Sequence, residues 1–547
     1  MQINISSSTK AIPIKKKKKL GIFKFILSFF LGFLGYFIIF GGIQKIFPHD
    51  FVKPYKQYSI SFDNGIPTET EDKIKADLGS VGFDEKKRFA FVEKDADFNV
   101  SWREGKGIIT QYYVPIAHLY SVEDNFLPTK QKIYTDINYP ENVIAILRSK
   151  YPTINTIANY SSLLDKNTKS VALVNFDSLT YKNKLLYLNG KYFLDDTSGS
   201  IEIGLGITPN NAFVQDIIDR NISNDIASIS FDKSKLGTIN QTGVTALTRN
   251  LATKIDRSGD MGYAAQLISK FLKSADITHV SNEISSVPGC KPSQGMRFCA
   301  RPEYLKTLTD SGVDIVELTG NHNNDYGAIY NANTLKSYTK MGIKYFGGGL
   351  NTADSKKILY LDIKGTKVAF LGYNYYDTMQ GTAEIAGADR AGSNKYSPAK
   401  IKADIATAKK SASVIIVDIQ FQECYSYPTS SAAYLPCYKP LANPDQQEVF
   451  RMAVDYGADI VVGTQAHQPQ TYEIYNGKLI FYGLGNLFFD QTPWVGTRQG
   501  IILTHYLYNG KLIQTKLTTT YYQDDMRTYV TTGSARTYLL TLLKNAR

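Results

Sequence analysis

The segment Asp314–Gly327 reads DIVELTGNHNNDYG and joins a short apolar run to a polar loop that is bounded by two glycines. The run DIVELT is typical of a strand, and the loop after it brings Asn321, His322 and Asp325 close together. Amide, imidazole and carboxylate groups are the ligands and proton carriers of metal-assisted phosphoester chemistry. A helix N-terminus capped by Asn or Asp is the other interpretation, but it explains one residue of the loop and not its whole length.

From about Gly243 onward, apolar segments that end in polar clusters recur along the chain. They are THVSNE (278–283), DIVELTGNH (314–322), KVAFLGYN (367–374), SVIIVDIQF (413–421), DIVVGTQAH (459–467) and KLIFYGLGN (478–486). Helix-like stretches separate several of these expected strands. The pattern predicts an α/β domain whose ligand-binding groups lie on the loops beyond the strand ends.

The sequence of residues 50–240 predicts a separate α/β domain, because short apolar runs alternate there with helix-like stretches. The expected strands lie at 89–92, 107–115, 170–176 and 184–188, and the expected helices lie at 69–78, 139–149 and 213–221.

The N-terminus predicts a membrane span. Phe25–Ile43 contains 19 residues without a charge and follows the cluster Lys15–Lys19. At about 1.5 Å per residue this stretch spans close to the ~30 Å hydrocarbon core. The lysines favour a cytoplasmic N-terminus, which puts the chain after about His49 outside the membrane. A cleaved signal peptide is the alternative, but the apolar run is too long and no A-x-A-like site follows it. We expect a cytoplasmic tail at 1–19 and an uncleaved, single-pass signal anchor at 20–47.

The net charge does not indicate nucleic-acid binding. The chain has 547 residues and a formal net charge of +12, of which eight lysines before Asp50 contribute +8. Most of the excess is therefore a local tail, and no zinc-finger spacing or basic-aromatic stripe occurs elsewhere. The length also excludes a single small module.

The four cysteines form two close pairs in the sequence, Cys290 with Cys299 and Cys424 with Cys437. Outside the cytoplasm, two local disulfides are the natural inference. Four cysteines allow three connectivities, and the sequence alone does not exclude the other two. A zinc site is less favoured, because neither pair has C-x-x-C spacing.

Five segments, in order, resemble the capsule-synthesis CapA family of the calcineurin-like metallophosphoesterase superfamily. They are TGVTALTR (242–249), ADITHVSNE (275–283), ELTGNHNNDYG (317–327), IIVDIQFQE (415–423) and VVGTQAHQPQTYEIYNGKLIFYGLGNLFFD (461–490). The resemblance implies a metallophosphoesterase α/β sandwich over residues 241–525, followed by a C-terminal helical segment at 526–547. In residues 50–240, the runs DADFNVSW, YYVPIAHLYSVED and VALVNFDSLTYKNKLLYLNG resemble the solute-binding-like domain that precedes the catalytic domain in some capsule-synthesis proteins.

The resemblance also implies site residues. His322 is the expected general acid with Asp325 as its orienting partner, and the expected metal ligands are Glu283, Asn321 and His467. Expected anion- or sugar-binding residues in the same cleft are Asn282, Arg249, Gln420, Gln465 and Asn486. The expected ligands Glu283, Asn321 and His467 suit one divalent ion (Mn, Mg, Fe or Zn), and the alternative is that the site holds no ion.

Three positions depart from the family pattern. Val244 stands where the family has a metal-ligating Asp after Gly. Gln420-Phe421-Gln422 replaces His-Trp-Gly, and Gly463–His467 reads GTQAH in place of Gly-His-His-Pro-His. Two interpretations follow: a metal-dependent phosphoesterase, or a polymer-binding or assembly protein with a degenerate metal site. The expected partners are the membrane, an anionic or sugar polymer such as poly-gamma-glutamate and other capsule-synthesis proteins, with no nucleic acid.

Overall fold

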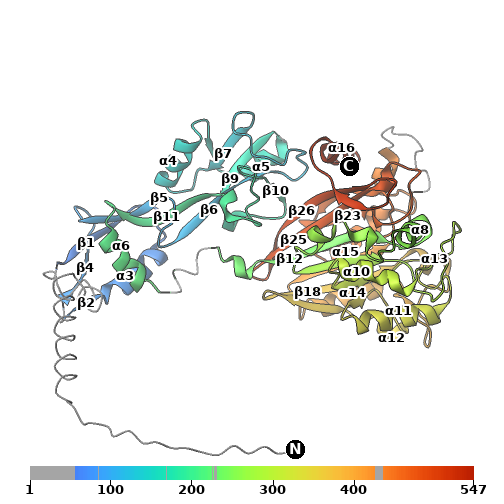
Figure 1. Ribbon diagram of the computed structural model, residues 1–547. Helices are drawn as coiled ribbons and strands as arrows, with labels where there is room; N and C mark the ends of the chain where they lie inside the picture. Colours follow the sequence, from blue (N-terminus) through green and yellow to red (C-terminus); the bar gives the residue numbers. More distant parts are fainter. Residues whose placement is uncertain (1–55, 84–85, 168, 224–225, 227–230, 425–434) are drawn as a thin grey trace, which may run out of the picture. The chain divides into compact units, whose positions relative to one another are not determined.

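The computed structural model describes residues 56–547 except 84–85, 168, 224–225, 227–230 and 425–434 (Figure 1). The predicted tail and anchor, residues 1–47, lie outside these described residues. Within them, no helix is long and apolar enough to cross a membrane. The chain divides into two compact units, one of residues up to Val100 together with Ile207–Ser223, and one of Ser101–Gly206 together with Asn224–Arg547.

The smaller unit is a mixed α/β structure in which β1 pairs in parallel with β4 and with the start of β5. Its elements are β1 (Tyr58–Phe62), α3 (Thr68–Gly79), β2 (Gly82–Phe83), β3 (Lys86–Lys87), β4 (Phe89–Phe91), the start of β5 (Phe98–Glu104), the end of β11 (Ile201–Thr208) and α6 (Ala212–Asn221). The predicted strand at 89–92 and the predicted helices at 69–78 and 213–221 are confirmed.

The larger unit begins with a sheet in the order β11-β6-β9-β7-β8, with β10 paired to β6. Its strands are β6 (Thr110–His118), β7 (Lys132–Asp136), β8 (Asn155–Ile157), β9 (Ser170–Asn175) and β10 (Asn183–Leu185), and its helices are α4 (Glu141–Lys150) and α5 (Tyr160–Lys166). The three strands and the helix predicted in this part of the chain are confirmed, with boundaries shifted by up to three residues.

Two further sheets of the larger unit carry the candidate site. The first has the order β15-β14-β13-β12-β25-β26-β27, with β24 beside β12. Its strands are β12 (Gly237–Thr245), β13 (Ile277–Asn282), β14 (Ile315–Glu317), β15 (Lys344–Phe346), β24 (Asn486–Phe488), β25 (Gln499–Tyr508), β26 (Lys511–Tyr522) and β27 (Thr528–Val530). The second has the order β17-β18-β20-β21-β23-β22, formed by β17 (Leu359–Ile363), β18 (Thr366–Asn374), β20 (Val414–Gln420), β21 (Ile460–Gly463), β22 (Pro469–Tyr475) and β23 (Lys478–Leu484).

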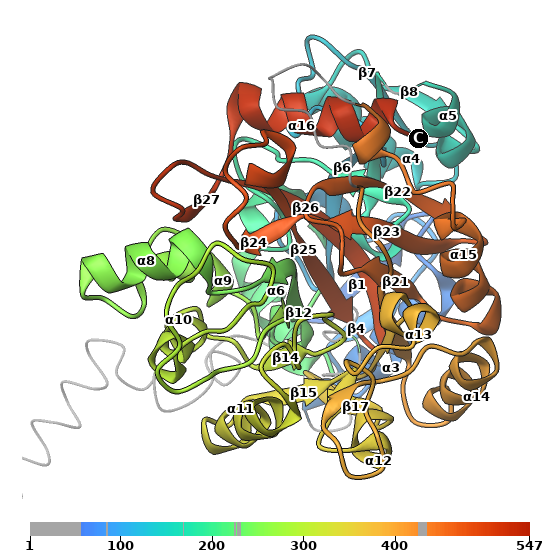
Figure 2. The ribbon, with the colours of Figure 1, turned by 90° about the vertical axis from the view of Figure 1, so that its right-hand side faces the viewer.

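The two sheets pack face to face. One buried apolar cluster lies between them and contains Ile239 and Leu503 of the first sheet with Ile416 and Val462 of the second. Helices cover both outer faces (Figure 2). On the first sheet they are α8 (Arg249–Ser258), α9 (Ser269–Leu272), α10 (Lys306–Asp310) and α11 (Ala328–Lys340), and on the second they include α14 (Pro398–Ala408) and α15 (Gln446–Tyr456). All six strands predicted after Gly243 are present, so the mixed α/β fold is confirmed.

A chain of buried polar groups runs between the two sheets. The hydroxyl of Thr515 donates to Nδ1 of His505 (2.9 Å), whose Nε2–H donates to Oε1 of Gln241 (3.0 Å). The amide of Gln241 donates to Asp418 (2.7 Å), and the other oxygen of Asp418 lies 3.1 Å from Nε2 of His279. Because His505 accepts at one nitrogen and donates at the other, it is neutral. Burial lowers the pKa of His505 to about 3, which agrees with that state.

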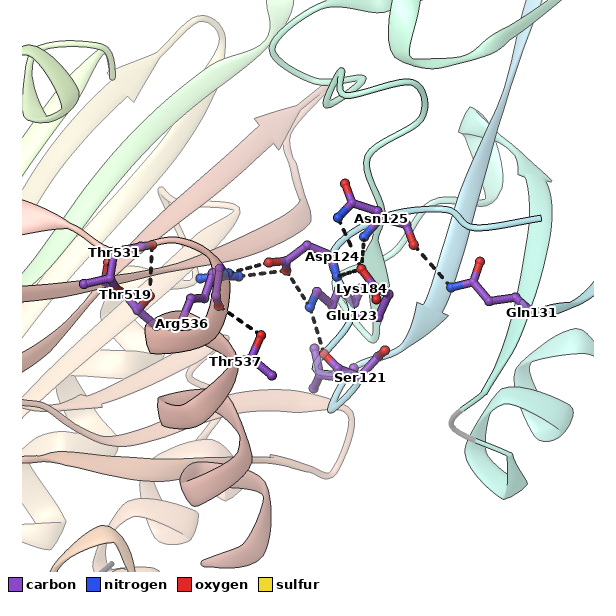
Figure 3. Close-up of polar contacts among 12 residues, drawn as sticks. Ser121, Glu123, Asp124, Asn125, Gln131, Lys184, Thr519, Thr531, Arg536 and Thr537 are labelled. Atoms are coloured by element: carbon purple, nitrogen blue, oxygen red, sulfur yellow. Dashed lines mark hydrogen bonds and ion pairs between the residues drawn. The ribbon is translucent and has the colours of Figure 1, made fainter. Parts of the chain in front are cut away.

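The C-terminal helix α16 (Gly533–Asn545) is fastened by a partly buried ionic contact, the Arg536 cluster of Arg536, Asp124 and Lys184 (Figure 3). Arg536 donates two hydrogen bonds to Asp124 (2.6 and 3.0 Å), and Nζ of Lys184 lies 2.7 Å from the same carboxylate. Burial raises the pKa of Asp124, but the hydrogen bond from Arg536 and the charge of Lys184 outweigh it and hold the pKa at about 2. Residues 101–206 and the two-sheet part of the larger unit are therefore joined by charged as well as apolar contacts.

Candidate functional site

The candidate site lies where parallel strands of both sheets end. Strands β12, β13 and β14 run in parallel, as do β18, β20, β21 and β23, so their carboxyl ends meet at one edge of each sheet. In open α/β sheets this is where ligands bind. The loops that follow these strands carry most of the residues that the sequence predicted, among them Glu283, Asn321, His322, Gln465 and His467.

Gly320 explains how the loop after β14 reaches Glu283. A side chain at position 320 would place its Cβ 2.4 Å from Cα of Glu283, so only glycine permits this close approach. A bridge between Ile284 and His322 continues the contact. The strand ends of β13 and β14 thus deliver Glu283 and His322 to the same place.

Glu283 is the most unusual group of the site. Its side chain is fully buried, and neither carboxylate oxygen receives a hydrogen bond from any residue that the structure describes. Burial raises the pKa of Glu283, while the neighbouring His467 and His322 lower it. A buried carboxylate without hydrogen bonds is unfavourable. Glu283 is therefore poised to bind a cation or a donor group of a ligand.

His322 and Asp325 form a hydrogen-bonded dyad. Nδ1–H of His322 donates to Oδ2 of Asp325 (2.8 Å), which leaves Nε2 for proton transfer. The backbone N–H of Phe298 donates to the same oxygen (2.6 Å), and the Phe298 ring lies 4.1 Å from the His322 ring. Burial lowers the pKa of His322, but the hydrogen bond to Asp325 and the charge of Glu283 outweigh it and raise the pKa above its ordinary value.

His467 is held from three sides. Its Nδ1–H donates to Oδ1 of Asn486 (2.8 Å), and the amide of Asn486 is itself oriented by its hydrogen bonds to Gln491 and to the carbonyl of Thr497. This contact fixes the tautomer and leaves the lone pair on Nε2. Nε2 lies 3.6 Å from a carboxylate oxygen of Glu423. The geometry suits a metal-ligating imidazole.

The predicted amides divide into two kinds. Gln420 donates to Gln465 (2.7 Å), and the Gln420 Oε1 atom has no partner within the described part of the chain. Oδ1 of Asn321 is buried and likewise accepts no hydrogen bond from a described residue. Asn282 is different, because its amide donates to the carbonyl of Ile284 and to Tyr338 of α11. Asn282 thus braces the loop, and Asn486 orients His467.

Arg249 and Val244 lie at the end of β12. Arg249 has a φ of +55°, which is unusual for a residue with a side chain, and its Nε atom is 3.7 Å from Asp490. Val244 is buried beside Asn486, with which it pairs in β12 and β24. Its apolar side chain stands where the resemblance implies a metal-ligating aspartate.

A divalent ion fits the donors in part. The unpartnered oxygens of Glu283 and Asn321 and Nε2 of His467 are the donor types that Mn²⁺ and Mg²⁺ accept. Over residues 56–547, with the gaps named above, no three His, Cys, Asp or Glu side chains are grouped so as to hold a metal ion. Together, the three donors named above would suit one ion that also takes an amide oxygen.

The sequence missed three groups of the site: Glu423, Phe298 and Glu384. Glu423 ends the segment IIVDIQFQE and contacts His467, and its place next to Cys424 was the only local signal. Glu384 accepts a hydrogen bond from the backbone N–H of Asn324 (2.7 Å), and burial raises its pKa to about 8. Both predicted disulfides, Cys290–Cys299 and Cys424–Cys437, are confirmed.

Comparison with known proteins agrees with this site. The family described as bacterial capsule synthesis protein PGA_cap matches residues 238–491. The chain is 28% identical over 291 residues to capsule biosynthesis protein CapA of Bacillus anthracis, which covers 52% of this chain and 66% of that protein. It is 30% identical over 213 residues to PGA biosynthesis protein CapA of Bacillus subtilis (strain 168), which covers 38% and 50%.

Among solved structures, a 5'-nucleotidase precursor from Thermus thermophilus aligns over 57% of this chain and 58% of that chain, at 13% identity and a TM-score of 0.30. A score this low supports no conclusion. The match to the two CapA proteins spans between half and two thirds of their own length. The matched residues include every predicted histidine, carboxylate and amide of the cleft, and residues 238–491 are similar to the bacterial capsule synthesis proteins that the PGA_cap family describes.

Proposed function

We propose that this chain acts outside the cytoplasmic membrane in the synthesis or export of a surface polymer, either poly-gamma-glutamate or a polysaccharide. The names of the CapA relatives, which refer to capsule and PGA biosynthesis, support the polymer role. The two disulfides support an oxidising compartment. The proposed anchor at residues 20–47 would keep the protein at the membrane, with its N-terminus in the cytoplasm.

The observation that carries the proposed chemistry is the buried carboxylate of Glu283, which has no hydrogen bond within the described structure. We infer that Glu283, Asn321 and His467 hold one divalent ion. When bound, such an ion supplies Lewis-acid polarisation of a phosphoester oxygen and activation of water. The charge of Glu283 favours a cation directly, because opposite charges a few ångströms apart attract strongly away from water.

The chain's own residues supply the remaining steps of a phosphoester hydrolysis. Asp325 and Glu283 raise the pKa of His322, which favours its protonated form, and in this proposal its Nε2–H protonates the leaving oxygen. Asp325 holds the imidazole in the required orientation. Arg249 and the carbonyl oxygen of Gln420, which accepts no hydrogen bond from a described residue, would bind the substrate.

A second function is favoured by Val244 and by the Gln420–Gln465 pair, which stand where the resemblance implies metal ligands. In this alternative the cleft binds a segment of the polymer and the protein guides assembly without turnover. Amides suit this role, since each one offers both a donor and an acceptor to sugar hydroxyls or to peptide groups.

Metal analysis of the purified full-length chain tests the proposal. We expect about one manganese ion per chain and phosphodiesterase or phosphatase turnover, both reduced in Glu283→Ala and His467→Ala. The matched control is Lys336→Ala, on the exposed face of α11, which should retain both. Metal binding without turnover would favour the binding protein. Neither metal nor turnover with any divalent ion would refute the hydrolase.

A further inference from the structure

Each of the two disulfides closes a loop and has a cysteine whose neighbour in the sequence contacts one histidine of the cleft. Cys290–Cys299 spans nine positions between β13 and α10, and Cys424–Cys437 spans 13 positions after β20. The side chains of Cys290, Cys299 and Cys437 are buried. The neighbours that reach the site are Phe298, directly before Cys299, and Glu423, directly before Cys424.

The first loop holds the His322–Asp325 dyad. Phe298, next to Cys299, donates its N–H to the carboxylate of Asp325, and its ring lies 4.1 Å from that of His322 at a tilt of 41°. Arg297 donates two hydrogen bonds, of 2.6 and 3.1 Å, to the carbonyl of Asp325. This loop therefore contacts both members of the dyad.

The disulfide of the first loop lies in a small apolar cluster of its own. Cys290, Cys299 and Val287 form a separate buried cluster, against which only Tyr326 and Tyr330 pack among the described residues. The other side of the loop is open, since 70% of Met296 is exposed. Phe298 itself belongs to the larger apolar cluster under the first sheet, where its ring lies 5.9 Å from that of Phe489, so the disulfide and this packing together set its position.

The second loop holds Glu423 against His467. The carboxylate of Glu423 lies 3.6 Å from Nε2 of His467, and Cys424 follows directly. Its partner Cys437 lies in a short helical turn, Leu435–Tyr438. Tyr438 belongs to the apolar cluster between the sheets and donates a hydrogen bond to Gln499 (2.6 Å). The disulfide thus ties Glu423 to a fixed point of the core.

We propose that the two disulfides act as separate positioning devices for the two histidines: Cys290–Cys299 sets His322 through Phe298, and Cys424–Cys437 sets His467 through Glu423. The inference deepens the proposed function and rests on it, because both histidines belong to the proposed site. It does not require turnover, since it concerns where two imidazoles lie and how they are covered.

Carbethoxylation of histidines, followed by peptide mass spectrometry of the full-length chain, tests this proposal. Cys290→Ser with Cys299→Ser should raise the modification rate of His322 severalfold and leave that of His467 unchanged. Cys424→Ser with Cys437→Ser should do the reverse. His279 and His505, which are fully buried, report in every sample whether the fold is intact.

Single substitutions that keep both disulfides make the test independent of folding. Phe298→Leu should raise the rate of His322 alone, and Glu423→Gln should raise that of His467 alone. Met296→Ala, in the same loop as Phe298, is the matched control and should change neither. If the cysteine variants expose His279 and His505, their fold is disturbed. The proposal is then judged on Phe298→Leu and Glu423→Gln alone.

Two results would overturn the proposal. In one, His322 and His467 keep their rates in the variants while His279 and His505 stay protected. In the other, either disulfide variant raises both rates together, which would mean that the disulfides act on the whole domain. Since the labelling needs neither metal nor substrate, a failed phosphoesterase assay would leave this result unaffected.

Discussion

The imidazole of His467 lies almost parallel to the ring of Phe489, with 9° between the planes and 4.8 Å between the centroids. Together with the hydrogen bond from Nδ1 to Asn486, this stacking fixes the ring so that Nε2 is directed at Glu423. A histidine held in this way loses little freedom when it binds a ligand, which favours affinity.

Replacement of Asn486 by Leu should weaken cation binding. The substitution removes the acceptor of Nδ1–H and releases the tautomer, so we expect the affinity for Mn²⁺ to fall about 10–100-fold. Titration calorimetry on the full-length chain measures it. Gln491→Leu is the control, because it removes a partner of Asn486 and leaves the bond to His467. Equal affinities in Asn486→Leu and the wild type would contradict the role of this bond.

Glu384 should make the protein less stable as the pH rises. Burial raises its pKa from 4.5 to about 8, so the folded state binds its proton more tightly than the unfolded state does. The contribution of this group is complete below about pH 4.5 and is lost as the pH rises to about 8, at no more than about 1.4 kcal/mol per pH unit. Urea unfolding of Glu384→Gln across this range should show a shallower decline than the wild type. The same decline in both would show that Glu384 is not the group responsible.

His505 should have the opposite effect at low pH. Its pKa falls from 6.5 to about 3 on folding, so the unfolded state binds the proton more tightly. The contribution of neutral His505 to the free energy of unfolding is fully present above about pH 6.5 and is lost as the pH falls toward 3. His505→Leu loses two hydrogen bonds and should be less stable at pH 7, but its stability should fall less between about pH 6.5 and pH 4. Parallel curves for the two proteins would refute this account.

Arg536→Ala should destabilise the larger unit. The change leaves the partly buried Asp124 and Lys184 with one charged partner fewer, so we expect a cost between that of a surface pair and the about 3–5 kcal/mol of a fully buried pair. Arg527→Ala, which breaks a more exposed pair with Asp525, should cost less than about 1 kcal/mol. Denaturant unfolding compares the two variants. A loss for Arg536→Ala no greater than that for Arg527→Ala would show that the Arg536 cluster contributes little.

The strands and the principal loops of the larger unit could be predicted because their signal is local. Apolar runs that end in polar residues identified β13, β14, β20 and β21, and the glycine-bounded loop identified His322 with Asp325. Contacts between loops left no such signal. Phe298 and Glu423 reach the histidines from segments distant in sequence, through disulfides whose pairing the sequence did not decide.

The role of the amides was also beyond sequence reasoning. Asn282, Gln420, Gln465 and Asn486 were all expected to bind a ligand, but hydrogen bonds within the domain already occupy much of their capacity. Whether an amide is used by its neighbours depends on the packing of loops from two sheets. The residue type alone does not determine it.

The ionic contact of Arg536 with Asp124 also bears on the order in which the chain matures during synthesis. The two residues are 412 positions apart, so Asp124 and Lys184 emerge from the ribosome long before their partner exists. Until Arg536 arrives, the surface that will be covered by α16 stays hydrated. The docking of α16 therefore follows the synthesis of every segment that it covers, from Asp124 to Thr471.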